Sequence, residues 1–298
     1  MLQRQSENLE SLCPSPNPKV SASGFAVPDG ACDSHFHVFG PRTMYPYQDS
    51  RDYTPPDASL KSVRKMHQIL GIQRGVITQP SVYGTDNRAT LDAVVSDPEN
   101  LRAVVALQTT VTDKEIEGFH AQGVRGFRLN FVDKGGLPFD SASKIKSFSS
   151  RLSDLGWHLE VLLKVDQYSE LKDVFSEFPI PVVFGHKGYM KTGQGLEHTG
   201  FRDLLDLLES GHIWIKLTGA YRITARTEPP YDDVVPFAKK LIETRSDRLL
   251  WGSDWPHPHH YQQMPSDTYL LDQLLDWTDD EAVIRKILVT NPESLYGF

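Results

Sequence analysis

The sequence predicts an α/β fold, a (β/α)8 TIM-like barrel formed by a single domain. Eight short apolar runs with the features of buried strands alternate with helix-like segments along the chain, which is the order that a parallel sheet requires. Polar residues follow the ends of these runs, where barrel enzymes keep their active sites. Candidate site residues occur in the first and last runs, and a closed barrel brings those two strands together.

Length and composition agree with one large domain. The 298 residues are 39% hydrophobic, which suffices for a sizeable core, and barrels of this kind commonly use about 250 residues. We expect the barrel over residues 31–298. Residues 1–30 are rich in Ser, Pro and Asn and lack the apolar core of a signal peptide, so they predict a loosely ordered N-terminal arm.

Charge and cysteine content exclude some partners. The formal net charge of −8, from 31 basic and 39 acidic residues, argues against a nucleic-acid surface. No run approaches the roughly 20 apolar residues of a membrane span, so we expect no membrane association and a cytoplasmic protein. Cys13 and Cys32 are too few for a disulfide framework or a zinc knuckle. The sequence leaves the oligomeric state open.

The first predicted strand, residues 33–40, carries a pair of histidines. Its alternation of polar and apolar residues places Asp33, His35 and His37 on one face. Two imidazoles at this spacing on a strand can share one metal ion or one substrate, whereas a helix would splay them. A polar edge strand produces the same pattern by chance, so the pair gains weight only from a second segment.

The other elements follow in regular alternation. We expect further strands over residues 75–79, 101–107, 124–130, 157–164, 182–187, 213–219 and 249–254. We expect helices over residues 59–70, 89–95, 112–122, 143–155, 168–177, 201–209, 232–244, 266–277 and 280–289. Ser59 caps the first helix and Gly71 follows its end. Residues 41–57 leave the carboxyl end of the first strand, so they are expected to fold over the site.

The last predicted strand supplies the second segment. It ends in Gly-Ser-Asp, and Pro256 forbids its continuation as a paired central strand. Asp254 therefore lies at the carboxyl end of a buried strand. His186 ends the sixth strand at the same end of the barrel. A lone histidine is more often a satisfied core residue than a ligand, but three at strand ends together with Asp254 favour a site.

Arg128 is the best candidate for an anion contact. It lies in the strand at residues 124–130, and a guanidinium that faces a barrel interior needs an anion or a carboxylate to meet it. Its planar fork matches a carboxylate in bidentate fashion. Arg125 is interpreted as a solvated or salt-bridged residue. Lys164 raises the alternative of a carboxylated lysine between two metals, but the chain supplies no second metal shell.

These segments resemble the amidohydrolase superfamily, in its branch of lactone hydrolases. Residues 33–37, 185–186 and 251–257 carry the likeness. Residues 32–41, 53–55, 86–88, 123–132 and 232–238 look most like the 2-pyrone-4,6-dicarboxylate hydrolases of that branch. The likeness covers nearly all of residues 31–298. It implies hydrolysis of a small anionic cyclic ester in the bacterial breakdown of aromatic compounds.

Matched position by position, the resemblance implies a role for each site residue. Asp254 is the implied general base toward water, while His35, His37 and His186 bind or polarise the lactone carbonyl. The implied substrate contacts hold carboxylates or line the pocket, and they are Arg128, Arg222, Tyr53, Ser81 and Lys134.

Two positions depart from the pattern of the pyrone-dicarboxylate enzymes. Lys134 stands where they tend to carry another arginine, and Leu162 where they tend to carry a tyrosine. Lysine offers a mobile point charge where arginine offers a planar fork, so a muconolactone bearing a sulfonate or a carboxylate is the main alternative substrate. Decarboxylation, lactone isomerisation and non-catalytic binding are further alternatives on this scaffold, although binding alone needs no base.

The sequence leaves the cofactor undecided. His35, His37, His186 and Asp254 form a complete ligand set for one divalent metal, with zinc the expected ion. The resemblance also implies a metal-independent alternative, in which the histidines polarise the carbonyl directly.

Overall fold

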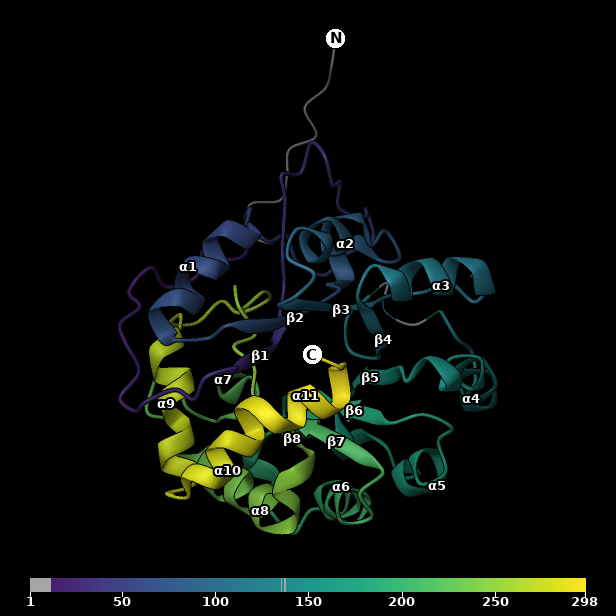
Figure 1. Ribbon diagram of the computed structural model, residues 1–298. Coiled ribbons are helices and arrows are strands. Elements are labelled where there is room, and N and C mark those ends of the chain that lie inside the picture. The colour runs from purple at the N-terminus through teal and green to yellow at the C-terminus, as the bar shows by residue number, and fades with distance from the viewer. Residues whose placement is uncertain (1–11, 135, 137) are drawn as a thin grey trace.

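The computed structural model describes residues 12–298, apart from residues 135 and 137. Its eight strands form one parallel sheet in sequence order. They are β1 (Cys32–Phe36), β2 (Arg74–Thr78), β3 (Leu101–Val105), β4 (Val124–Asn130), β5 (His158–Leu162), β6 (Val182–Phe184), β7 (Ile213–Lys216) and β8 (Leu249–Leu250). Helices surround these strands (Figure 1). The predicted (β/α)8 barrel is confirmed.

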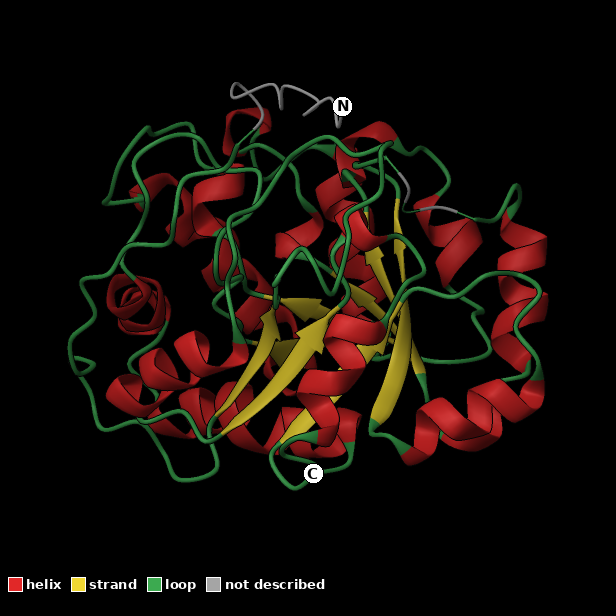
Figure 2. Cartoon of the chain, turned by 90° about the horizontal axis from the view of Figure 1, so that it is seen from above, coloured by secondary structure: helices red, strands yellow, loops and turns green. Residues whose placement is uncertain are grey.

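The helices alternate with the strands and cover the outside of the barrel. They are α1 (Leu60–Leu70), α2 (Arg88–Val95), α3 (Asp113–Ala121), α4 (Ala142–Ser150), α5 (Leu171–Phe175), α6 (Thr199–Glu209), α7 (Ala220–Ile223), α8 (Val235–Arg245), α9 (Asp267–Trp277), α10 (Glu281–Arg285) and α11 (Asn291–Tyr296). Figure 2 shows the strands pointing in one direction, with long loops gathered at their carboxyl ends. Among the described residues, no helix combines the length and the apolar composition needed to cross a bilayer.

Several short segments supplement these helices. They are the 3-10 turns η2 (Ser81–Tyr83), η3 (Ser153–Leu155), η4 (Val165–Gln167), η5 (His186–Gly188), η6 (Thr192–Gln194), η7 (Asp232–Val234) and η8 (Ser246–Arg248), and the π-helical turn η9 (Lys286–Thr290). The last of these corrects a prediction, because residues 280–289 do not form one helix. Instead α10 passes through η9 into α11.

The ends of the barrel sheet are joined by backbone hydrogen bonds. β8 is short, but the chain beyond it continues alongside β1. The Ser34 N–H donates to the Trp251 carbonyl at 2.9 Å, and the Asp254 N–H donates to the His35 carbonyl at 2.8 Å. The first and last strands therefore meet, and the backbone itself holds Asp254 beside His35.

Local sequence signals set the helix ends as expected. The Ser59 hydroxyl accepts from the backbone N–H of Ser62 at the start of α1, and Gly71 ends that helix with a φ of 80°. In α3, Thr112 and Glu115 form a reciprocal capping box. Such caps satisfy backbone groups that a helix end leaves unpaired, so these loops begin and end at defined residues.

An apolar layer fills the barrel at the end that α11 crosses (Figure 1). It consists of strand residues that pack against two residues of α11, and its members are Cys32, Val76, Val104, Val183, Trp214, Leu250, Leu295 and Tyr296. The opposite end is thereby free to carry polar groups, because the apolar layer already supplies a packed core.

The described part of the N-terminal arm, residues 12–30, contains no helix or strand of its own. It is nevertheless attached to the barrel. The Cys13 N–H donates to the Thr54 carbonyl at 2.8 Å, and the Ser21 N–H donates to the hydroxyl of Thr268 in α9 at 2.9 Å. Residues 12–30 are therefore hydrogen-bonded to the barrel at these points, while residues 1–11 lie outside the described residues.

Gly252 allows the close approach of the last strand to the first, so Gly252→Ala should destabilise the fold. An added Cβ would lie 2.7 Å from both the Cβ and the backbone nitrogen of His35. We expect the free energy of unfolding in urea to fall by roughly 1–3 kcal/mol. Gly118→Ala is the matched control, because a Cβ there meets nothing within 4 Å and alanine favours the helix by roughly 0.5–1 kcal/mol. Equal stability of the two variants would contradict this packing.

Candidate active site

His35, His37, His186 and Asp254 come from distant parts of the sequence and meet at the carboxyl end of the barrel. His35 lies in β1 with His37 just beyond it, His186 begins η5 after β6, and Asp254 follows β8. Nε2 of His35 and Nε2 of His37 each lie 3.5 Å from Oδ1 of Asp254. Nε2 of His186 lies 4.0 Å from Oδ2 of the same carboxylate. All four side chains are buried.

A bulge in β1 corrects the expected alternation of its side chains. The register against β2 shifts within the strand, and His35 and His37 face the site whereas Asp33 does not. Asp33 accepts hydrogen bonds from the Ser253 hydroxyl at 2.5 Å and from Nε2 of His67 in α1 at 3.0 Å. The prediction that Asp33 shares a face with the two histidines is wrong, because one extra residue inverts the side-chain pattern.

A buried ion pair lies beside His35. Nζ of Lys216 in β7 donates to Oε2 of Glu160 in β5 at 2.5 Å and lies 3.1 Å from Nδ1 of His35. Burial lowers the pKa of His35 to about 4, and the Lys216 ammonium acts in the same direction. His35 is therefore neutral at pH 7. Burial would raise the pKa of Glu160, but the Lys216 ammonium holds it well below its usual range.

The other two imidazoles have fixed partners on their Nδ1 atoms. Nδ1 of His37 lies 2.7 Å from the Thr78 carbonyl. A carbonyl only accepts, so Nδ1 carries a proton, and in the neutral ring Nε2 keeps a lone pair on the side of Asp254. Nδ1 of His186 lies 2.7 Å from the Thr218 hydroxyl, and burial lowers the pKa of His186 well below its usual value.

Asp254 has two oxygens in different environments. Oδ2 accepts from the Tyr221 hydroxyl and from Nε of Arg222, each at 2.5 Å. Oδ1 is buried and has no hydrogen-bond partner among the described residues. Burial would raise the pKa of Asp254, but the Arg222 guanidinium holds it well below its usual range. The ionised Oδ1 is therefore the atom available to take a proton or to bind a cation.

The loops that carry these groups have a strained backbone. Across the described residues, every non-glycine residue with positive φ lies shortly after β6 or β8. These residues are His186, Lys187, Tyr189, Asp254, His257 and His259, with φ between 48° and 63°. Such conformations cost on the order of 1–3 kcal/mol each and concentrate where the surrounding structure holds a functional group in place.

A polar cavity lies against three of the four central residues, His37, His186 and Asp254, and its wall includes Arg128. The lining residues are His37, Tyr53, Arg128, Asp133, Leu162, His186, Tyr189, Arg222, Asp254, Pro258 and His259. Arg128 is 7% exposed, and its Nη1 donates to the Gln79 carbonyl at 3.0 Å. Its Nε is buried and has no hydrogen-bond partner among the described residues. A guanidinium in this state suits an anion from outside the protein.

Arg222 and Tyr53 also line the cavity, but each is engaged within the protein. Arg222 is bonded to Asp254, and its Nη2 donates to the Pro258 carbonyl at 2.9 Å. The Tyr53 ring stacks on His259 with centroids 5.2 Å apart. The structure therefore places both residues at the cavity, with Arg222 in direct contact with the carboxylate.

The last two expected contacts, Ser81 and Lys134, lie outside the cavity wall. Ser81 donates to the Tyr53 hydroxyl at 3.4 Å. The Lys134 side chain is 69% exposed, and its Nζ lies 3.0 Å from Oδ1 of Asp52. The structure does not bring Lys134 to the cavity, whereas Leu162 contributes an apolar part of its wall.

Sequence reasoning missed several groups at the site. For Glu160 and Lys216 a signal existed, because each is a charged residue within an otherwise apolar strand. For Asp133 and His259 none existed. They lie in loops after β4 and β8, and Nδ1 of His259 lies 3.2 Å from Oδ1 of Asp133.

The central residues fit a metal ion. One donor atom from each of His35, His186 and Asp254 lies within 4.8 Å of the others. Nε2 of His35 and Oδ1 of Asp254 are buried without hydrogen-bond partners among the described residues. Nε2 of His37 adds a lone pair 3.5 Å from Oδ1. Nε2 of His37 and Oδ1 of Asp254 are two acceptors that face each other, which calls for a cation between them, and nitrogen with carboxylate oxygen is a common ligand set for divalent metals.

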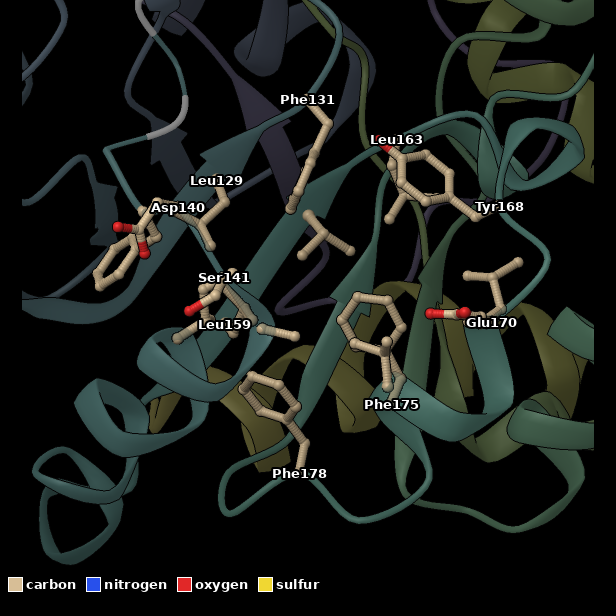
Figure 3. A pocket seen from close by; sticks show the side chains of 16 residues that line it. Leu129, Phe131, Asp140, Ser141, Leu159, Leu163, Tyr168, Glu170, Phe175 and Phe178 are labelled. Carbon is tan, nitrogen blue, oxygen red and sulfur yellow. The ribbon is translucent and has the colours of Figure 1, made fainter.

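A second cavity, on the outside of the barrel, contains none of these groups. It has a volume of about 300 Å³ and lies among β4, β5, α4 and α5. Its wall is mainly apolar and includes Phe131, Phe175 and Phe178, as Figure 3 shows. It lacks histidine, and the chemistry described above belongs to the smaller, polar cavity.

Comparisons with known proteins agree with this geometry. Residues 32–298 match the family model described as Amidohydrolase. The chain is 38% identical over 287 residues to 4-sulfomuconolactone hydrolase of Rhizobium radiobacter, covering 96% of each chain. It is 35% identical over 280 residues to 2-pyrone-4,6-dicarboxylate hydrolase of Comamonas testosteroni, covering 91% of this chain and 92% of that one. A solved structure of a probable 2-pyrone-4,6-dicarboxylic acid hydrolase from Acinetobacter baumannii, with citric acid bound, gives a TM-score of 0.78 at 27% identity, covering 90% of this chain and 100% of that one.

Proposed function

The chain belongs to the amidohydrolase family, and we propose that it hydrolyses a small anionic lactone. The observation that carries the proposal is Oδ1 of Asp254, which lies among imidazoles without a hydrogen-bond partner among the described residues and shares a cavity with the Arg128 guanidinium, whose Nε likewise lacks one. A base, groups that polarise a carbonyl and an anion contact are together what the hydrolysis of such an ester needs. The relatives named as lactone hydrolases support the same reaction class.

The proposed reaction begins at Oδ1 of Asp254. This oxygen takes a proton from a water molecule while the water oxygen bonds to the lactone carbonyl carbon. The carbonyl oxygen becomes negatively charged, and the imidazoles of His35 and His186 stabilise that charge, because Nε2 of His37 presents a lone pair and cannot donate to it. The ring C–O bond then breaks, and the departing ring oxygen takes the proton that Asp254 holds. The product is the open-chain acid, and Asp254 returns to its ionised form.

His35, His37, His186 and Asp254 would hold one Zn²⁺. A bound divalent ion supplies Lewis acidity toward the carbonyl oxygen or the attacking water. The facing lone pairs of His37 and Asp254 support a cation at this point. Without a metal, polarisation of the carbonyl falls to the imidazoles alone.

For the substrate, we propose a muconolactone bearing a sulfonate or a carboxylate ahead of 2-pyrone-4,6-dicarboxylate. The relative named 4-sulfomuconolactone hydrolase supports this order, as do the apolar Leu162 in the cavity wall and the position of Lys134 outside it. Arg222 already donates a hydrogen bond to Asp254. The proposal therefore assigns the main anion contact to Arg128 and a secondary one to Arg222.

Asp254→Asn tests the base. The amide keeps the shape of the side chain but cannot accept a proton at this step, so kcat for an anionic lactone should fall by roughly 10²–10⁴-fold. Binding of the lactone, measured by calorimetry on the slow variant, should stay close to that of the parent. Near-normal hydrolysis by the variant would contradict the mechanism.

Arg128→Met tests the anion contact. Removing a buried charge that meets a substrate anion should cost roughly 2–5 kcal/mol of transition-state stabilisation, measured through kcat/KM. A neutral lactone should be affected much less. Arg125→Met is the matched control, because Arg125 lies on the same strand but bonds to the carbonyls of His120 and Val124. Equal losses on charged and neutral lactones would make Arg128 a structural residue.

Metal content tests the zinc. We expect elemental analysis of purified protein to find close to one Zn²⁺ per chain, and His37→Asn to lower the zinc affinity measured by titration, because a ligand is lost. His158→Asn is the control, since that histidine is buried but lies apart from the metal donors. A chelated, metal-free protein with full activity would overturn this part of the proposal and leave carbonyl polarisation to the imidazoles.

A further inference from the structure

Behind Asp254 lies a chain of buried polar side chains that the proposed reaction does not use directly. The Tyr221 hydroxyl, which donates to Oδ2 of Asp254, also lies 3.1 Å from Nδ1 of His257. Nε2 of His257 lies 3.2 Å from Oδ1 of Asp267, the first residue of α9. Each of these side chains is buried. The order of contacts is therefore Asp267, His257, Tyr221 and Asp254.

We propose that Tyr221, His257 and Asp267 are positioning residues that lock Oδ2 of Asp254 and so leave Oδ1 as the proton acceptor. The inference rests on the proposed function, because it concerns the base of that reaction. None of the three residues lines the cavity. They act on the substrate only through Asp254.

The number of hydrogens available determines which group donates in each of these hydrogen bonds. The Tyr221 hydroxyl has one proton, and its 2.5 Å contact with Oδ2 has the length of a bond from a hydroxyl to a carboxylate. That proton therefore belongs to the bond with Asp254. The 3.1 Å contact between Tyr221 and His257 is then a hydrogen bond only if the N–H at Nδ1 of His257 donates.

Asp267 orients the imidazole from the other side. Neither of its carboxylate oxygens has a hydrogen-bond partner among the described residues, and a buried carboxylate without a compensating neighbour is costly. Nε2 of His257 lies 3.2 Å from its Oδ1, and this contact compensates the carboxylate only if Nε2 also carries a hydrogen. With Nε2 held toward Asp267, Nδ1 is held toward Tyr221.

A backbone hydrogen bond also connects His257 to Asp254. The His257 N–H donates to the Asp254 carbonyl at 2.7 Å, and both residues have positive φ. The strained turn therefore fixes the position of the His257 ring relative to Asp254. Without the hydrogen bond from Tyr221 to Oδ2, the Asp254 carboxylate can rotate and exchange its two oxygens. An oxygen that is free to accept a proton then faces the attacking water for a smaller fraction of the time.

The test compares variants in one assay of kcat and KM, on an anionic lactone that the parent hydrolyses. Tyr221→Phe should lower kcat by roughly 10–100-fold, the usual effect of removing a residue that orients a catalytic group, with KM unchanged. His257→Leu should have a similar effect. His257→Asn should recover part of kcat, because its side-chain amide can donate in place of Nδ1.

A double variant separates this role from general stability. Tyr221→Phe combined with His257→Leu should be no slower than Tyr221→Phe alone, because His257 acts through Tyr221. Tyr296→Phe is the control for the loss of a buried hydroxyl, since Tyr296 belongs to α11 and packs in the apolar layer at the opposite end of the barrel, and it should keep the parent kcat. If His257→Leu does not fold, Tyr221→Phe and His257→Asn carry the test.

The outcomes distinguish this inference from the proposed function. An active parent whose Tyr221→Phe variant keeps the parent kcat overturns the inference and leaves the function intact. Additive losses in the double variant also overturn it, because they show that the two residues act independently. A parent that hydrolyses none of the anionic lactones removes the proposed function, and the inference falls with it.

Discussion

The site depends on a buried carboxylate, Asp254, of which one oxygen is hydrogen-bonded and the other has no hydrogen-bond partner among the described residues. Removing Asp254 from water costs several kcal/mol, and the contacts of Tyr221 and Arg222 with Oδ2 offset much of that cost. They also keep the group ionised. The remaining oxygen has no choice of orientation, because Oδ2 is held on one side and the backbone of Asp254 is bonded to β1 on the other. The loops after β6 and β8 accept a strained backbone around this arrangement.

The charges inside the barrel are arranged in layers above an apolar base. Next to the apolar layer beneath α11 come Lys216 and Glu160, which neutralise each other. Farther toward the loops, Arg222 meets Asp254. Arg128 is different, because its nearest carboxylate contact is 3.9 Å away, at Glu160, and Glu160 is already paired. The cavity therefore contains a positive charge without a close partner, which agrees with an anionic substrate.

The sequence was sufficient for the strand order and for the central residues of the site, and the reason is geometric. His186 and Asp254 each follow a strand, and the carboxyl ends of parallel strands share one end of a barrel. The face of β1 on which Asp33 lies could not be predicted. Alternation assumes that successive side chains point to opposite faces, and a bulge inserts one extra residue without a sequence signal. The pairing of Glu160 with Lys216 joins strands distant in the sequence. The exposed position of Lys134 depends on a loop without periodicity.

The destination of a water oxygen tests the central claim most directly. Purified protein would be given one turnover of 4-sulfomuconolactone or 2-pyrone-4,6-dicarboxylate in water labelled with oxygen-18, and the product would be analysed by mass spectrometry. Attack by water activated at Asp254 predicts a ring-opened acid that carries one labelled oxygen in the new carboxylate. An unlabelled product with the mass of the substrate, or a product that has lost carbon dioxide, would identify an isomerase or a decarboxylase and contradict the account.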